Sequence, residues 1–271
     1  MDVNVTYIGG PTALIEIAGM RLLTDPTFDP AATEYATAHY TLRKTAAPAL
    51  AADALGHIDA VLLSHDHHAD NLDRAGRALL DRVPHILTTQ AGAQRLGGRV
   101  RGLAPWETVT LVTPGYGELT VVATPARHGP ADGDRGPVVG FLLLTDDPAQ
   151  RAVYVSGDTV WYDGVAEVAR RYRCAVALLF SGAARVRAVG PAHLTFTAGE
   201  MVAAAHAFDG AAIAPLHFEG WEHFTESRDD IGAAFAAAGM NARLAWLPPG
   251  RPRAFSLGPS LVPTRREAVP A

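Results

Sequence analysis

The decapeptide Ser64-His65-Asp66-His67-His68-Ala69-Asp70-Asn71-Leu72-Asp73 brings three imidazoles and three carboxylates together within ten positions. It directly follows an apolar run at residues 58–63. An apolar run that ends in a polar cluster predicts a buried strand that leads into a loop. Neutral imidazole and ionised carboxylate are ligands that suit zinc, iron and manganese. A solvated loop does not require three histidines within four positions, so this stretch predicts a metal site.

The rest of the chain alternates between strand patterns and helix patterns. Apolar alternation with Gly and Pro turns predicts strands at 3–8, 13–17, 20–23, 85–88, 108–112, 119–124, 138–145, 152–156, 175–179, 211–215 and 242–247. Helical spacing and N-cap residues predict helices at 72–82, 164–171, 199–208 and 229–238. Residues 26–56 read as a long loop that covers a site. Strands followed by helices, twice over, predict an α+β protein with two mixed sheets packed face to face and helices outside.

Length and composition predict a globular protein with a sizeable core. Of the 271 residues, 48% are hydrophobic and 19% are charged, which is ordinary for one domain over residues 1–250 with a peripheral tail at 251–271. The net charge of −5 and the lack of basic runs argue against a nucleic-acid partner. The single cysteine, Cys174, lies in an apolar stretch and is expected to be buried.

The composition also bears on location and partners. Neither a secretory signal pattern nor an apolar stretch approaching the length of a membrane span is visible, so we expect a cytoplasmic protein without stable membrane insertion. The expected partner is a small-molecule substrate, and a homo-oligomer stays open.

Three further candidate ligands lie where predicted strands end. His128 follows the strand at 119–124, Asp158 the strand at 152–156, and His217 the strand at 211–215. Because rigid strands position the loops that follow them, active sites are commonly built at such ends. Together with the decapeptide, these residues form a series of potential metal ligands on four strand ends.

The sequence resembles the metallo-β-lactamase-fold hydrolases, especially the branch of ascorbate-phosphate lactonases and N-acyl-phosphatidylethanolamine phospholipases. The resemblance covers roughly residues 3–247 and rests on an ordered series of segments: 7–10, 13–17, 23–26, 64–73, 125–128, 156–159 and 215–218. It implies a four-layer αββα sandwich with one or two metal ions at one edge of the sheets. It also implies that His128 and His217 are ligands and that Asp158 bridges two ions.

The decapeptide departs from the family signature, His-x-His-x-Asp-His followed by Leu-Asp. It is one residue longer, and Asn71 stands where the final histidine would fall. Read forward, His65 and His67 are ligands; read backward, Asp70 and His68 match, and Asp66 takes the place of the first histidine. We favour His65 and Asp70 as ligands, with His67 and His68 competing for one role. An amide is a poor zinc ligand, so the second ion is in doubt.

Other residues are assigned by their position beside these segments. His193 is expected to assist an oxyanion or leaving group, unless it is a solvent-facing residue at a helix entry. Asp25 is expected to orient a ligand imidazole, with a plain Asp-Pro turn as the alternative, and Asn71 to lie beside the ions without ligating them. Aromatic side chains near the ligands predict a pocket for a partly apolar substrate, lined by Trp161, Tyr162, Trp221 and His223.

The leading functional hypothesis is metal-dependent hydrolysis of an ester, lactone, amide or phosphodiester. One or two zinc ions would activate water, with manganese or iron as alternatives, and Asp70 would orient that water or accept its proton. Two alternatives stay open. One is iron-dependent oxygenase or persulfide chemistry on the same fold; the other is a metal-depleted, non-catalytic binding protein.

Overall fold

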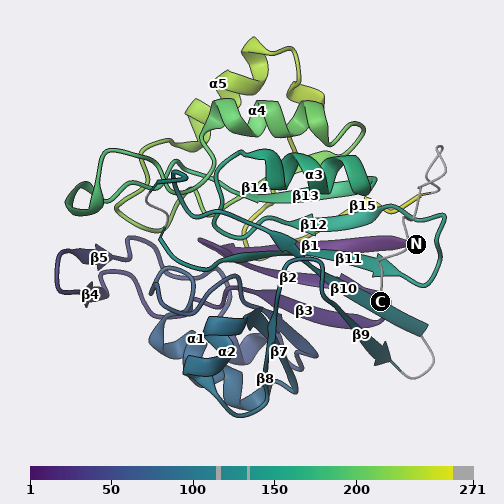
Figure 1. The fold of residues 1–271 in the computed structure, drawn as a ribbon, viewed down its shortest axis with the longest axis horizontal. Helices are drawn as coiled ribbons and strands as arrows, with labels where there is room; N and C mark the ends of the chain where they lie inside the picture. Colours follow the sequence, from purple (N-terminus) through teal and green to yellow (C-terminus); the bar gives the residue numbers. More distant parts are fainter. Residues whose placement is uncertain (114–116, 133–134, 259–271) are drawn as a thin grey trace.

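Two mixed β-sheets lie face to face in the computed structural model, which describes residues 1–113, 117–132 and 135–258 (Figure 1). The first sheet has seven strands in the order β15-β1-β2-β3-β6-β7-β8. Its strands are β1 (Asp2–Gly9), β2 (Thr12–Ile17), β3 (Met20–Thr24), β6 (Ala60–Leu62), β7 (His85–Thr89), β8 (Val100–Leu103) and β15 (Pro252–Ser256). Pairing is antiparallel from β15 to β3 and parallel from β3 to β8.

The second sheet has six strands in the order β14-β13-β12-β11-β10-β9. Its strands are β9 (Thr108–Thr113), β10 (Gly117–Pro125), β11 (Val139–Thr145), β12 (Ala152–Val155), β13 (Cys174–Phe180) and β14 (Ala212–Leu216). Strands β12, β13 and β14 are parallel, and the others are antiparallel. The sequence therefore predicted two mixed sheets correctly.

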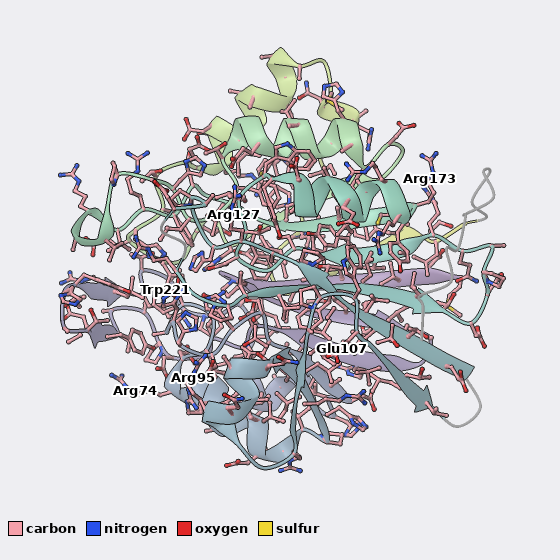
Figure 2. All side chains as sticks on the ribbon, viewed as in Figure 1. Arg74, Arg95, Glu107, Arg127, Arg173 and Trp221 are labelled. Atoms are coloured by element: carbon pink, nitrogen blue, oxygen red, sulfur yellow. The ribbon has the colours of Figure 1, made fainter. Side chains whose placement is uncertain are left out.

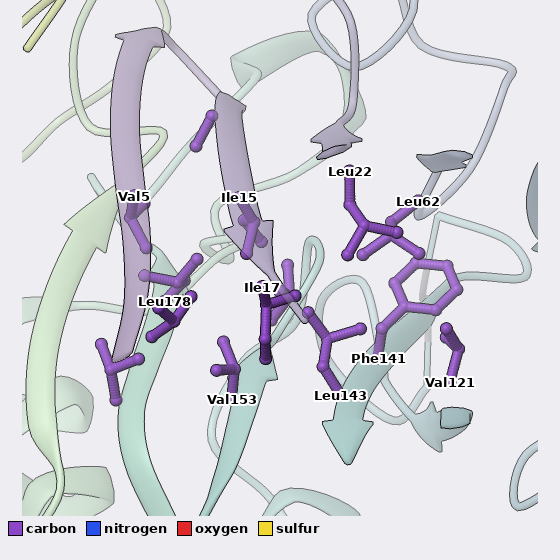
Figure 3. Packing of buried hydrophobic residues seen from close by; sticks show 14 of the residues in the cluster. Val5, Ile15, Ile17, Leu22, Leu62, Val121, Phe141, Leu143, Val153 and Leu178 are labelled. Atoms are coloured by element: carbon purple, nitrogen blue, oxygen red, sulfur yellow. The ribbon is translucent and has the colours of Figure 1, made fainter. Parts of the chain in front are cut away.

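The main core lies between the two sheets. In β1, Val3, Val5 and Tyr7 point inward, because side chains of a strand alternate between its two faces. Figure 3 shows this inner layer, in which side chains of the first sheet, such as Ile15, meet side chains of the second, such as Phe141. Both of these residues are fully buried. Burying such alternating apolar faces is the main force that holds the sheets together.

Helices cover the outer face of each sheet, which completes the four-layer arrangement predicted for this chain. The first sheet is covered by α1 (Arg74–Leu79) and α2 (Gln90–Leu96). The second is covered by α3 (Asp163–Arg171) and α4 (Ala198–Ala207), and α5 (Arg228–Ala237) packs on α4 (Figure 1). A capping box of Thr197 and Glu200 begins α4, and Ser227 caps α5. Among the described residues, no helix combines the length and apolar character needed to cross a bilayer.

Several elements differ from the prediction. The expected tail from residue 251 starts with a strand, β15, which pairs with β1 and buries Phe255 in the core; Leu257, just after the strand, is buried there too. Residues 259–271 lie outside the described part. Residues 242–247 do not form the predicted strand, because Leu244 makes only an isolated bridge to Ile213 after a 3-10 turn at Asn241–Arg243. The loop at 26–56 contains a small hairpin of β4 (Glu34–Ala36) and β5 (Thr41–Arg43).

The topology brings the predicted ligands to one edge of the sandwich. Strand β6 leads into the decapeptide, and β10, β12 and β14 lead to His128, Asp158 and His217. Parallel pairing gives β12 and β14 the same direction, and two antiparallel steps give it to β10 as well. Parallel strands present their carboxyl ends at the same edge, so the loops that follow them meet there.

Candidate metal centre

The start of the decapeptide is fixed by hydrogen bonds to neighbouring strands. The backbone N–H of Ser64 donates to Oδ1 of Asp25 at 2.6 Å, and the carbonyl of Ser64 accepts from Val139 at 3.1 Å. Burial raises the pKa of Asp25 well above its ordinary value. We expected Asp25 to orient a ligand imidazole, but it holds the backbone of the loop. The imidazole of His65 instead meets the hydroxyl of Ser64, with 2.9 Å between Nδ1 and Oγ.

A first cluster is formed by three imidazoles and one carboxylate. Nδ1 of His68 lies 2.9 Å from Nε2 of His65 and 3.2 Å from Nε2 of His128. Nε2 of His128 lies 3.6 Å from Oδ2 of Asp158. Ligand atoms around one tetrahedral zinc ion lie roughly 3.3 Å apart, given bonds of about 2.0–2.1 Å. These three distances are close to that spacing, and His65, His128 and Asp158 offer ligand atoms within 4.8 Å of one another.

The two histidines that competed for one role point in different directions. Nε2 of His67 bonds to the carbonyl oxygen of Arg135 at 2.8 Å, and the side chain is exposed. One nitrogen of His67 still lies within 4.8 Å of nitrogens of His65 and His68. Only His68, however, has a nitrogen within 3.2 Å of those of both His65 and His128. The geometry thus favours His68 over His67.

A second cluster adjoins the first and shares Asp158 with it. Asp70, Asp158 and His217 are all buried and offer ligand atoms within 4.8 Å of one another. Nδ1 of His217 contacts Oδ1 of Asp158 at 2.8 Å, and its Nε2 lies 3.6 Å from Oδ2 of Asp70. That Nε2 is buried and has no hydrogen-bond partner within the described ranges. A fourth side chain, His223, lies with Nε2 only 3.0 Å from the same oxygen of Asp70.

Burial and charge shift the protonation of the candidate ligands. Burial lowers the pKa of His217, but Asp158 and Asp70 outweigh it and raise that pKa above its ordinary value. Burial lowers the pKa of His65 and His128, and lowers that of His68 to about 3, so these imidazoles are neutral. Burial alone would raise the pKa values of Asp70 and Asp158, but the surrounding histidines outweigh it and keep both carboxyls ionised. Neutral imidazoles beside carboxylates, with an orphaned His217 nitrogen, fit a zinc, iron or manganese ion.

The two other carboxylates of the decapeptide make structural contacts, whereas Asn71 does not. Asp66 binds Arg95 of α2, so it does not take the place of the first histidine. The carboxylate of Asp73 caps α1 through the N–H of Gly76 at 2.7 Å and accepts from Lys44 at 3.0 Å. Both polar atoms of the Asn71 side chain are buried and unpartnered in the described part of the chain.

Lys44 links three segments around the site. Its ammonium is buried with the Asp73 carboxylate, and the two side chains are 4% and 0% exposed. Lys44 also forms an isolated bridge with Trp221, and its Nζ lies 5.4 Å from the centroid of that ring. Figure 2 shows Trp221 near the base of the β4–β5 hairpin, where it packs on Tyr35 and Leu42.

A small pocket opens over the two clusters. Its lining residues come from the β4–β5 hairpin, the two clusters, Arg135 and the segment 184–194: Tyr40, Leu42, His68, Asp70, His128, Arg135, Ala184, Val186, Val189, Leu194 and His223. The sequence did not indicate Tyr40, Leu42 or Arg135, because each lies in a loop or hairpin without a chemical motif.

Of the four residues expected to line a substrate pocket, His223 lines this one, and Trp221 lines a second cavity, beside Lys44 and Gly10. Trp161 and Tyr162 pack against the outer core of the second sheet, and the guanidinium carbon of Arg127 lies 4.6 Å from the centroid of the Tyr162 ring. Core packing thus accounts for this aromatic pair. His193, which we expected to assist a leaving group, pairs with Glu200 at 3.2 Å and is not among the pocket-lining residues of the described ranges.

Comparison with known proteins identifies the family. The sequence model described as the Beta-lactamase superfamily domain matches residues 20–218. The chain belongs to the beta-lactamase superfamily. The UPF0173 protein YddR of Bacillus subtilis is 25% identical over 238 residues, which are 84% of this chain and 90% of that relative.

Solved structures share the fold of this superfamily member. The isothiocyanate hydrolase from Delia radicum gut bacteria has a TM-score of 0.76 at 22% identity, covering 94% of this chain and 99% of that one. A metallo hydrolase from the archaeon Ignicoccus hospitalis has a TM-score of 0.69 at 20% identity, with coverage of 94% and 99%. This superfamily member therefore has the metallo-β-lactamase fold of metal-dependent hydrolases, with candidate ligand clusters at the sheet edge.

Proposed function

We propose that the protein is a hydrolase that holds two divalent metal ions and cleaves an ester, lactone, amide or phosphodiester bond of a small organic molecule. The observation that carries this proposal is the pair of adjacent clusters that share Asp158. His65, His68, His128 and Asp158 would hold one ion, and Asp70, Asp158 and His217 would hold the other. Such ions lower the pKa of water and polarise the carbonyl or phosphoryl oxygen of a substrate.

Side chains of the pocket support a role in orienting the substrate. Burial raises the pKa of Tyr40, the charge of Asp70 raises it further, and Arg135 lowers it, so the hydroxyl lies in the field of both charges. Arg135 donates from Nη2 to the carbonyl oxygen of Val189 at 2.7 Å, which fixes its guanidinium at the pocket wall. We propose that Tyr40 and Arg135 bind the polar end of the substrate.

The other walls of the pocket suggest which substrates to test. Leu42, Val186, Val189 and Leu194 are apolar and favour an aliphatic or aromatic group beside the bond that is cleaved. The resemblance to the lactonase and phospholipase branch makes lactones and phosphodiesters the first choices. Since a protein of the same fold is named an isothiocyanate hydrolase, isothiocyanates belong in the same panel.

The test combines metal reconstitution with this substrate panel. Chelator-treated protein is reloaded with Zn²⁺, Mn²⁺ or Fe²⁺ and assayed on chromogenic esters, lactones, amides, phosphodiesters and isothiocyanates. We expect activity to return in proportion to bound metal and to fall at least about 10³-fold in Asp158→Asn. Asp163→Asn, which removes an exposed carboxylate of α3, is the matched control and keeps full activity. Failure to bind any of the three metals would disprove the proposal.

A further inference from the structure

The second cluster lacks the histidine that the family signature would supply. In this chain Asn71 occupies the position after Asp70, and an uncharged amide is a weak ligand for zinc. Without that histidine, the cluster holds Asp70, Asp158 and His217. Three protein ligands from this set leave room for one more side chain in a four-coordinate site.

His223 lies beside this cluster in space, although it lies about 150 residues beyond the motif. Its Nε2 lies 3.0 Å from Oδ2 of Asp70, and Nε2 of His217 lies 3.6 Å from the same oxygen. Two imidazole nitrogens therefore converge on one carboxylate oxygen. These separations bracket the roughly 3.3 Å between ligands of one tetrahedral ion.

The loop that carries His223 is held in place on both sides. The backbone N–H of His217 donates to the carbonyl of Gly10 at 2.8 Å, and the backbone N–H of Arg185 donates to the carbonyl of His223 at 2.9 Å. The backbone N–H of Glu222 donates to the carbonyl of Arg43 at 3.0 Å, which connects the loop to β5. The His223 side chain is only 10% exposed. A side chain fixed in this way meets the requirement that metal ligands be positioned before the ion binds.

We infer that His223 is a ligand of the second ion, together with Asp70, Asp158 and His217, and that it replaces the motif histidine that is absent at Asn71. This inference rests on the proposed function, since it requires the clusters to hold metal. It makes the second site a pair of imidazoles and a pair of carboxylates. The alternative is that His223 only donates a hydrogen bond to Asp70 and so orients that carboxylate.

The two roles differ in how strongly metal binding depends on His223. Loss of a residue that orients a ligand typically weakens metal binding about 10–100-fold. Loss of a ligand should weaken it more. The test is a Zn²⁺ titration against a chromogenic chelator, with ions per chain counted by mass spectrometry after dialysis. We expect two ions in the wild type and only one in His223→Ala, with second-ion affinity reduced more than about 100-fold.

Two matched variants serve as controls. His206→Ala removes an exposed imidazole from α4, and Asn71→Ala removes the amide at the motif position; both should keep two ions. Circular dichroism and thermal melts show whether each variant is folded. If His223→Ala does not fold, His223→Cys provides a second ligand type; there Co²⁺ should give a thiolate charge-transfer band that the wild type lacks.

The outcomes separate the two proposals. Two tightly held ions in folded His223→Ala, or no thiolate band in cobalt-loaded His223→Cys, would overturn the role of His223 and leave the proposed hydrolase intact. A wild type that binds no metal would instead overturn the proposed function itself. Loss of the second ion in Asn71→Ala alone would assign the ligand to Asn71 and contradict the inference.

Discussion

Asp66 and Arg95 form a two-point ion pair, in which Nε of Arg95 lies 2.9 Å from Oδ2 and 3.1 Å from Oδ1 of Asp66. The Asp66 side chain is 3% exposed, and Arg95 comes from α2, at the outer helical layer of the first sheet (Figure 2). One carboxylate of the decapeptide is thus used to attach the loop to a helix, and the carboxylate of Asp70 faces the clusters.

This division predicts different effects for two similar substitutions. Asp66→Asn should keep full metal content but reduce the free energy of unfolding by about 1–2 kcal/mol, because it weakens a charge-assisted pair whose carboxylate is buried and whose guanidinium is half exposed. Asp70→Asn should lose one ion per chain and keep more of its stability. Metal analysis and urea unfolding of both variants measure this. A loss of metal in Asp66→Asn would mean that Asp66 takes the place of the first motif histidine as a ligand.

The directions of the two adjacent histidines predict an equally clear contrast. His68→Ala should abolish binding at the first cluster, because its Nδ1 is the atom between His65 and His128. His67→Ala should keep both ions, since its Nε2 is engaged with the carbonyl of Arg135. Equilibrium dialysis against Zn²⁺ compares them. Equal losses in the two variants would contradict the geometry.

We expect that the position of Gly76 does not tolerate even one added methyl group. A Cβ there would lie 1.8 Å from the carbonyl oxygen of Pro26. Gly76→Ala should therefore lower the free energy of unfolding by at least about 3 kcal/mol, as overpacked backbone contacts do. Gly232→Ala, in α5 with open space around it, is the control and should stabilise the protein by about 0.5–1 kcal/mol. Chemical denaturation distinguishes them; similar stabilities would disprove the contact.

We expect the thiol of Cys174 to resist modification in the folded protein. It is buried in β13, and burial raises its pKa to about 12. Since the thiolate is the reactive form, iodoacetamide at pH 8 should leave native protein unlabelled and label it fully in guanidinium chloride. Mass spectrometry reads both states. Rapid labelling of the folded protein would show that β13 opens readily.

The pair of His193 and Glu200 predicts a pH-dependent contribution to stability. The hydrogen bond to Glu200 raises the pKa of His193 above its ordinary value. The folded state therefore binds the proton more tightly, so the stabilisation is complete below the unfolded pKa of about 6.5 and disappears as pH rises through the folded pKa. His193→Gln should melt below wild type at pH 5.5 and match it at pH 9. Because the side chain is 33% exposed, the effect should be small.

The sequence predicted most of the fold because most elements are locally encoded. Alternation in β1 and the capping box of α4 are local signals, and both elements form where expected. Residues 252–256 were not predicted as a strand, because Phe255 is the single buried side chain of this edge strand and the segment has no apolar alternation. Their identity as a strand comes from pairing with β1, which no local pattern encodes.

The candidate site was predicted in its components and missed in its arrangement. The chemical nature of His65, Asp70, His128, Asp158 and His217 pointed to a metal centre. The choice between His67 and His68 depended on how a loop with one extra residue folds, which spacing alone does not determine. Arg135 and Tyr40 reach the pocket only through tertiary contacts, so they carried no signal in the sequence.

The buried ammonium of Lys44 has a consequence for how the protein opens. It connects the hairpin above the pocket, the end of the decapeptide and the loop that carries His217 and His223. The hairpin cannot separate from the decapeptide without leaving the Asp73 carboxylate buried without its cation, and it cannot separate from the loop without breaking the bridge between Lys44 and Trp221. They should therefore unfold as one cooperative unit, and their slowly exchanging amide protons should share a common opening free energy in native-state hydrogen exchange.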